Sequence, residues 1–437
     1  MSVNRTLLSV DKSSLIDFIS TREEPEWILA ERLQALELVE QLPYPKLEKT
    51  RLEQWDFGLL GSHVQPRRVS SLQELPAGAA SHVVSENVIV GRNSGVAFIR
   101  LSDELEGKGV IFTDLDIAVR DHTDLVRPYY MRAIHANENI ITALHATART
   151  GGVFLYVPEN VHIEVPLQAL FVQDQADAIH MPHVLIVAEA NSCVTFIENV
   201  ISSLGSTGSY STNGMLEVFV KPGAKVSIVS IHNVEASVID TTYRRAVVEA
   251  DGAIEWIIGE LNEGNAVSDT TTLIQGTGAS SDAKIICVGK GGQKLDLTTR
   301  AVHFGKHTDS DMLTKAVMTG QSTAIINGIT KIEKGASGTN GQQTERVLML
   351  SPEARGDANP ILLIDEDDVK AGHAASVGQV NAEQLYYLMS RGINKEEAQR
   401  LIINGFLMPV IAEIPYEDVQ DQIIQLVERK LGIKGGA

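Results

Sequence analysis

The residues best suited to chemistry lie in one short stretch, Ile361–Gly378, which reads I-L-L-I-D-E-D-D-V-K-A-G-H-A-A-S-V-G. An apolar run, Ile361–Ile364, is followed by four consecutive acids, Asp365–Asp368, and then by small residues that carry His373. Carboxylates and neutral imidazole can both bind divalent transition metals. The pattern predicts a strand, an acidic turn and a small-residue loop that could bring a side chain to an interface. A solvated turn with a partly buried structural histidine would explain the same residues.

The two cysteines, Cys193 and Cys287, are far apart and lack CxxC spacing. They cannot form a disulfide framework, and the chain therefore has the cysteine usage of a cytoplasmic protein. Each lies in a β-like run, S-C-V-T-F-I or I-I-C-V-G, where we expect a small buried apolar residue. No metal-ligand spacing surrounds either cysteine.

The histidines form only weak patterns. His180 and His183 could bind a metal, but a turn before a strand explains H-M-P-H equally well. His303 and His307 would need a helix to share one face, and their surroundings are typical of strand and turn. We therefore do not predict a metal site at either pair.

Composition excludes several classes of protein. The 437 residues include 37 Lys and Arg against 56 Asp and Glu, a net charge of −19, which argues against a general nucleic-acid binder. The sequence contains no apolar run long enough for a transmembrane helix, and its N-terminus, M-S-V-N-R-T-L-L-S-V-D-K, lacks the apolar core of a signal peptide. We expect a cytoplasmic protein with no membrane partner.

The middle of the chain is repetitive. Between Gly151 and about Leu350, β-branched runs alternate with Gly, Asn, Asp or Pro turns. The starts of five such strand–turn–strand units are 30, 33, 28 and 26 residues apart, and they lie at Val157, Val187, Val220, Val248 and Ile274. This period predicts a β-solenoid, whose units bury their apolar faces by stacking. A β-sandwich is the competing fold.

Helices are expected on both sides of this region. Glu24–Leu42 places Leu29, Leu33 and Leu36 on one face of a helix, with Pro25 in its first turn. Residues 61–95 are loop-rich, and Asp121–Ala148 forms a second helical patch that could pack on the end or side of the solenoid.

Three helices are predicted after the acidic stretch. Asn381 and Asn394 are helix N-cap candidates, and Gly392 and Gly405 are expected beyond the two helix ends. A third helix is predicted over Tyr416–Leu431. The predicted protein is thus mainly β, with an N-terminal helical domain and connector (1–95), a β-helix core (96–355) and a C-terminal helical domain (356–437).

Enzyme motifs are missing. The sequence contains no Walker P-loop, GxSxG or HExxH, and the glycine runs G-T-G-A-S-S and G-K-G-G-Q lie inside the repeats as solenoid turns. A β-helix carbohydrate-active enzyme is the enzyme alternative. It is disfavoured because the carboxylates do not recur in register and because such enzymes are usually secreted.

Several segments together resemble one known family. They are G-Q-Q-T-E-R-V-L-M-L-S-P-E-A-R-G-D-A-N-P-I-L-L-I, the acidic stretch with H-A-A-S-V-G, then L-Y-Y-L-M-S-R-G-I and A-Q-R-L-I-I-N-G-F; near the N-terminus they are W-I-L-A-E-R-L-Q-A-L-E-L-V-E-Q-L-P-Y-P and E-Q-W-D-F. The chain resembles the SufB/SufD family of iron–sulfur cluster assembly proteins, and its SufD branch more than its SufB branch. The resemblance spans most of the chain, with the most specific block at 342–406.

The resemblance implies a right-handed parallel β-helix between two helical domains, in agreement with the repeats. It implies a non-catalytic subunit of a SufB–SufC–SufD complex, paired with a SufB-like paralogue through the β-helix and bound by a SufC-like ABC ATPase on the C-terminal helices. Such a complex builds a nascent cluster and passes it to apoproteins, and the SufD subunit is tied to iron supply. The isolated chain could also form a homodimer.

The resemblance also carries roles to particular residues. His373 matches a family histidine that would face SufB as an iron or cluster ligand, with a thiolate from that partner completing the site. Many family members have Cys two residues earlier, where this chain has Ala371. We therefore expect no cofactor held stably by this chain alone and only transient iron or cluster in the complex, which disfavours the SufB-like, cluster-bearing alternative. No residues support a flavin. The SufC dock is expected at Leu385, Leu388, Arg391, Leu401 and Phe406.

Overall fold

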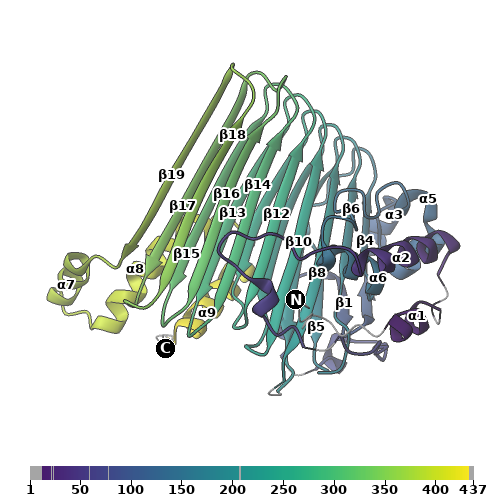
Figure 1. Cartoon of the computed structure of the whole chain (residues 1–437), viewed down its shortest axis with the longest axis horizontal. Coiled ribbons are helices and arrows are strands. Elements are labelled where there is room, and N and C mark those ends of the chain that lie inside the picture. The colour runs from purple at the N-terminus through teal and green to yellow at the C-terminus, as the bar shows by residue number, and fades with distance from the viewer. Residues whose placement is uncertain are drawn as a thin grey trace, which may run out of the picture.

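The computed structural model describes residues 12–432, except 21, 23, 59, 77, 206 and 207, and its centre is a β-solenoid (Figure 1). From β4 onward, even-numbered strands form one sheet and odd-numbered strands the other, with nine and ten strands in total. Neighbouring coils pair in parallel, for example β8 with β10 and β9 with β11. The predicted parallel solenoid is confirmed, and the sandwich alternative is wrong because sandwich sheets are antiparallel.

The strand bounds follow the coils along the chain. In the ten-stranded sheet they are β1 (Asn87–Arg92), β2 (Gly95–Arg100), β5 (Leu167–Gln173), β7 (Cys193–Ser202), β9 (Lys225–Asn233), β11 (Ala253–Glu260), β13 (Ser280–Gly289), β15 (Asp309–Met318), β17 (Thr339–Met349) and β19 (Val369–Gln379). In the nine-stranded sheet they are β3 (Ile111–Asp114), β4 (Gly152–Val157), β6 (His183–Ala188), β8 (Tyr210–Val220), β10 (Val238–Val248), β12 (Ala266–Ile274), β14 (Lys294–His303), β16 (Thr323–Ile332) and β18 (Arg355–Ile364).

The predicted repeats are the coils themselves. Val157, Val220, Val248 and Ile274 are the last residues of β4, β8, β10 and β12, and the turns after them lead to the other sheet. Ile364 has the same place at the end of β18. The stretch 361–378 is therefore one more copy of the repeat.

The space between the sheets is a continuous core, because one side chain in two points inward along each strand. A cluster of buried residues runs through it from Ile89 to Ala354. Trp256 lies fully buried in this core, and its indole nitrogen donates to Thr272 Oγ1 at 3.0 Å. Stacking of coils thus provides a core that no single unit could form.

The N-terminal helices are α1 (Lys12–Ser20) and α2 (Glu26–Val39). Pro25 is the N-cap of α2, one residue before the helical turn in which it was predicted, and the predicted apolar face is wrong for two of its three leucines. Leu29 and Leu33 are 37% and 44% exposed, whereas the buried face carries Arg32. The reason is an ion network that the leucine spacing cannot reveal.

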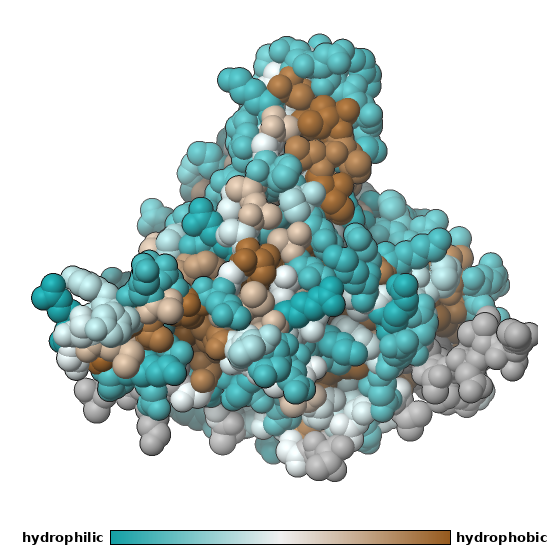
Figure 2. All heavy atoms as spheres, turned by 60° about the vertical axis from the view of Figure 1, so that its left-hand side comes forward, coloured by the Kyte–Doolittle hydropathy of each residue, from teal (hydrophilic) through white to brown (hydrophobic). Residues whose placement is uncertain are grey.

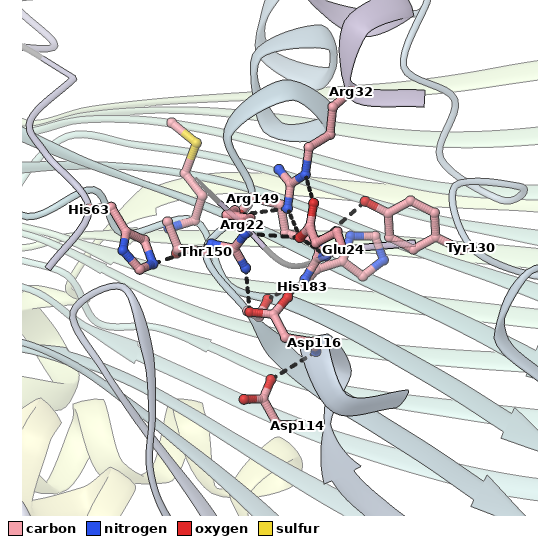
Figure 3. Close-up of polar contacts among 12 residues, drawn as sticks. Arg22, Glu24, Arg32, His63, Asp114, Asp116, Tyr130, Arg149, Thr150 and His183 are labelled. Carbon is pink, nitrogen blue, oxygen red and sulfur yellow. Dashed lines mark hydrogen bonds and ion pairs between the residues drawn. The ribbon is translucent and has the colours of Figure 1, made fainter. Parts of the chain in front are cut away.

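This network joins the helical segment to the first coil (Figure 3). Glu24 accepts from Arg32 Nε at 2.6 Å and lies 3.4 Å from Arg149 Nη2, while Arg149 Nη1 lies 2.7 Å from Asp116 Oδ1. Arg22 bridges Glu24 and Asp116. Burial favours the protonated form of Glu24, but the three arginines hold its pKa below the ordinary value. Paired in this way, the buried charges fasten α2 to the solenoid.

More helices cover the outer face of the nine-stranded sheet. They are α4 (Leu115–Asp121), α5 (Thr123–Val126) and α6 (Ile140–Ala148), whereas α3 (Asp103–Gly107) places Leu105 in the core between the sheets. The predicted helical patch at 121–148 is thus α5 and α6 joined by turns, and α6 is buried from Ile141 to Ala148. With Trp55 and Phe57 these elements pack against outward-facing residues such as Phe219 and Tyr243.

The C-terminal helices are α7 (Ala382–Ser390), α8 (Lys395–Ile411) and α9 (Glu417–Leu431). Asn381 Oδ1 accepts from Glu383 N at 2.8 Å and Asn394 Oδ1 from Glu397 N at 2.9 Å, which confirms both predicted N-caps. The predicted third helix is also confirmed.

The predicted end of the second helix at Gly405 is wrong. The helix α8 runs on to Ile411 because its later turns bury Ile403, Leu407 and Val410 against the ten-stranded sheet. Glycine in a helix costs only about 1 kcal/mol, which this burial exceeds.

Two domain boundaries need correction. The solenoid begins with β1 at Asn87 and ends with β19 at Gln379, so both sheets extend beyond the predicted core of 96–355. The physical reason is backbone pairing: β18 pairs with β16 and β19 with β17 along their whole lengths. Residues 1–11 and 433–437, the ends of the predicted helical domains, lie outside the described residues.

Candidate metal and partner interface

The stretch 361–378 is the last coil of the solenoid. After β18 the chain turns through Asp365–Asp368 and enters β19, which pairs in register with β17 from Thr339↔Val369 to Met349↔Gln379. The predicted small-residue loop is therefore wrong, because these residues form strand hydrogen bonds. Within the described chain, β18 and β19 each end their sheet, so each leaves one backbone edge without a neighbouring strand.

The four acids form a turn that the preceding coil stabilises. Gly335 N donates to Glu366 Oε2 at 2.8 Å, and Lys334 Nζ lies 3.7 Å from Glu366 and 3.6 Å from Asp367. The hydrogen bond from Gly335 is the main reason that the pKa of Glu366 lies below its ordinary value. These contacts support the reading of the acidic run as a solvated turn.

His373 lies in the middle of β19 and is exposed. It is in register with Gln343, one of the alternate residues of β17 that are buried between the sheets. Parallel pairing keeps side chains on the same face, so His373 stands at the open mouth of the solenoid. None of the described residues hydrogen-bonds its imidazole. It is thus available to a metal or to a partner chain.

Beneath His373 the core changes from apolar to polar. Gln343 is buried, and in the orientation that satisfies both ends of its amide it donates to Thr330 Oγ1 at 3.1 Å and accepts from Ile361 N at 3.2 Å. Glu345, two residues further along β17, is 2% exposed, and neither of its carboxylate oxygens accepts a hydrogen bond from a described residue. Burial raises the pKa of Glu345 to about 7.

The last coil also exposes apolar side chains. Leu363, Ile364 and Val377 are 47%, 41% and 44% exposed. Figure 2 shows an apolar area on the projecting end of the molecule, with hydrophilic residues around it. An exposed apolar area beside open strand edges is typical of a protein–protein interface.

A second candidate surface is the hairpin of α7 and α8, which projects beyond the last coil (Figure 1). No residue of α7 is buried, and Tyr386 and Tyr387 are 74% and 57% exposed. A cleft of about 530 Å³ lies between the two helices and is lined by Glu383, Gln384, Tyr387, Leu388, Leu401, Ile402 and Gly405.

The five predicted docking residues do not all lie on this surface. Leu388 and Leu401 line the cleft, and Arg391 beside it donates to Tyr387 Oη at 3.2 Å. Leu385 is half-buried on α7. Phe406 faces the solenoid instead, because Lys315 on β15 sits 5.2 Å from its ring and donates to its carbonyl oxygen at 2.6 Å.

Cys287 is buried, as predicted, whereas Cys193 is only partly buried. Cys287 is fully buried in the core, and burial raises the pKa of its thiol to about 12, so it stays protonated. Cys193 is half-buried on β7 and lines a surface cleft of about 440 Å³.

The histidine pairs are structural. His183, the first residue of β6, bonds to His145 at 3.2 Å and to Glu217 at 3.0 Å, while His180 bonds to Thr212 at 2.7 Å. His303 is buried and bonds to Thr308 and Ser310, each at 2.9 Å. The described residues of neither pair come together as metal ligands.

Comparison with known proteins identifies the family. A family model described as "SUF system FeS cluster assembly, SufBD core domain" matches residues 171–406, and one described as "SufBD protein N-terminal region" matches residues 95–169. The chain belongs to the SufBD family. It is 46% identical to the iron–sulfur cluster assembly protein SufD of Bacillus subtilis over 98% of this chain and 99% of that protein. It is also 29% identical to a SufBD family protein of Staphylococcus epidermidis over 95% of this chain and 92% of that protein.

These relatives confirm the predicted SufB/SufD resemblance and place the chain in the SUF system of iron–sulfur cluster assembly. In the described part of the SufBD chain no helix is long and apolar enough to cross a membrane.

Sequence reasoning did not identify Glu345 or the network around Arg149. The sequence does contain a hint of Glu345, because an acidic residue stands two positions after Gln343, on the same face of a strand. This hint can be recognised only when it is known which face of β17 points inward.

Proposed function

We propose that this SufBD chain is a non-catalytic scaffold subunit of a cytoplasmic SufBCD-type complex. In this proposal it pairs with a SufB-like paralogue through the last coil, docks a SufC-like ABC ATPase on the α7–α8 hairpin, and contributes His373 to iron or a cluster shared with the paralogue. Iron and the nascent cluster are the cargo of the complex.

The observation that carries the proposal is the uncovered last coil. It combines two open strand edges, exposed Leu363 and Val377, and an exposed imidazole on one end of the solenoid. A second solenoid of the same family could extend both sheets across this end by strand pairing. Neutral imidazole is a good iron ligand, and a partner thiolate would supply the soft ligand that Ala371 lacks.

The hairpin supports the docking of a further subunit. Its exposed tyrosines and the cleft around Leu401 form an amphipathic surface. Tyrosine is enriched among the residues that contribute most to binding at protein interfaces. Both helices begin with an asparagine N-cap, so the surface is preorganised before it meets a partner.

The test is co-purification of the three subunits with substitutions in this chain. Leu401→Asp is expected to release the ATPase and retain the paralogue, because a charge in the apolar cleft must be desolvated on docking. Leu33→Asp is the matched control, since Leu33 and Leu401 are both 44% exposed on helices. Retained ATPase with Leu401→Asp would refute the docking surface.

The same preparations test His373. His373→Ala is expected to assemble normally but to transfer clusters to an apoprotein at least about tenfold more slowly, as expected when a metal ligand is lost. Normal maturation with this variant would refute the ligand role and leave the pairing intact.

A further inference from the structure

Glu345 is a buried carboxylate whose two oxygens accept no hydrogen bond from any described residue. Burying an unpaired carboxylate is costly, so each such group requires an explanation. Its polar neighbours Gln343 and Thr330 satisfy one another. Of these three side chains, Glu345 is therefore the one that lacks a hydrogen-bond partner among the described residues.

The coil around Glu345 leaves room for its carboxylate. Gly328 on β16 faces it across the core, and a Cβ atom at that glycine would lie 2.0 Å from Glu345 Oε1. The residues in register on the last coil are Ala375 above Glu345 and Pro360 above Gly328, and neither offers a hydrogen-bond donor from its side chain. The carboxylate thus lies one layer below the open end, under small side chains.

His373 stands on the same inward face of the next strand. Its register partner is Gln343 and that of Glu345 is Ala375, so His373 and Glu345 are diagonal neighbours. Diagonal positions on paired strands lie about 7–8 Å apart, within the combined reach of an imidazole and a glutamate on either side of one ion.

We propose that Glu345 and His373 together bind one divalent transition-metal cation at the mouth of the solenoid. This proposal rests on the metal role assigned to His373 and adds a second ligand from the same chain. One carboxylate and one imidazole suit Fe²⁺, Mn²⁺, Co²⁺ or Zn²⁺, whereas a thiolate-free site disfavours Cu⁺. Two protein ligands give weak binding in the isolated chain, and a partner chain would supply the others.

The test uses the isolated full chain without oxygen, titrated with Co²⁺ and followed by visible absorption. Wild type is expected to bind one Co²⁺ per chain. Glu345→Gln and His373→Ala should each weaken binding at least about tenfold. The control is Glu353→Gln, which removes an equal charge from an exposed turn near the same end and should leave the affinity unchanged.

A second variant tests the same site in case Glu345→Gln does not fold. Gly328→Ala keeps Glu345 in the chain but fills the space of its carboxylate, so it should also weaken Co²⁺ binding. Wild-type affinity in folded Glu345→Gln would overturn the inference. Co-purification with the paralogue is measured on the same samples. Retained pairing with unchanged Co²⁺ affinity in Glu345→Gln rejects only this site, whereas wild type that binds Co²⁺ but does not pair rejects the proposed function.

Discussion

Two buried glutamates show how differently the two ends of the solenoid are built. Near the first coils, Glu217 is fully buried and accepts from Met131 N at 2.8 Å, Ala133 N at 2.7 Å and Ile134 N at 2.9 Å, and it also bonds to His183. Near the last coil, Glu345 is equally buried but has no such donors among the described residues.

The difference extends to the surroundings of each glutamate. At the first coils, helices cover the outer sheet face, and their arginines and acids pair with one another, as Figure 3 shows. At the last coil the strand edges, His373 and Val377 remain exposed. Polar groups satisfied within the chain stabilise the fold, whereas those left unsatisfied at an open end are suited to a ligand or partner.

Replacing each glutamate by leucine should give the largest contrast. Glu217→Leu leaves three backbone N–H groups without an acceptor, and we expect the free energy of unfolding to fall by about 3–5 kcal/mol. Glu345→Leu removes a buried unpaired carboxyl and should leave stability unchanged or raise it by about 1 kcal/mol. Urea denaturation followed by circular dichroism measures both. Equal losses in the two variants would contradict the comparison.

A smaller effect is expected from Asp114 at the covered end. Burial, with the charge of Asp116, raises the pKa of Asp114 to about 7. The folded chain therefore binds more protons than the unfolded chain between about pH 4 and 7, and the free energy of unfolding falls as the pH rises through this window. In wild type, Asp116 N donates to Asp114 Oδ1 at 3.0 Å. Asp114→Asn keeps an oxygen that can accept this N-cap hydrogen bond, but the amide cannot ionise.

The variant should therefore be more stable than wild type by at least about 1 kcal/mol at pH 8 and equal to it near pH 4. Thermal or urea unfolding across this pH range checks the prediction. A stability difference that is constant with pH would show that the charge of Asp114 is not its cause.

The smallest effect on stability is expected at the open end. Val377→Asp changes a side chain that is 44% exposed, so the free energy of unfolding should change by about 0.5 kcal/mol or less. Under the proposed function, this charge would have to be buried when the chain pairs with a SufB-like paralogue, so the pairing should weaken at least about tenfold. Leu29→Asp, at a site 37% exposed on α2, is the control and should pair normally. Titration of each labelled variant with the paralogue measures its affinity and distinguishes Val377→Asp from Leu29→Asp.

Sequence by itself determined the features that depend on near neighbours. The coils were predicted because apolar strands and turn residues recur at short intervals, and the starts of α7 and α8 were predicted because Asn381 and Asn394 bond to backbone N–H groups within three residues. Such interactions join residues that lie close together in the sequence.

Only the tertiary structure decided which residues meet across long separations. It buried Arg32 instead of Leu29, because Arg149 and Glu24 complete a network from distant segments. It carried α8 past Gly405 and turned 369–379 into a strand, because burial and pairing outweighed local preference. It also placed Glu345 diagonally below His373, since strand register brings together residues that the sequence separates.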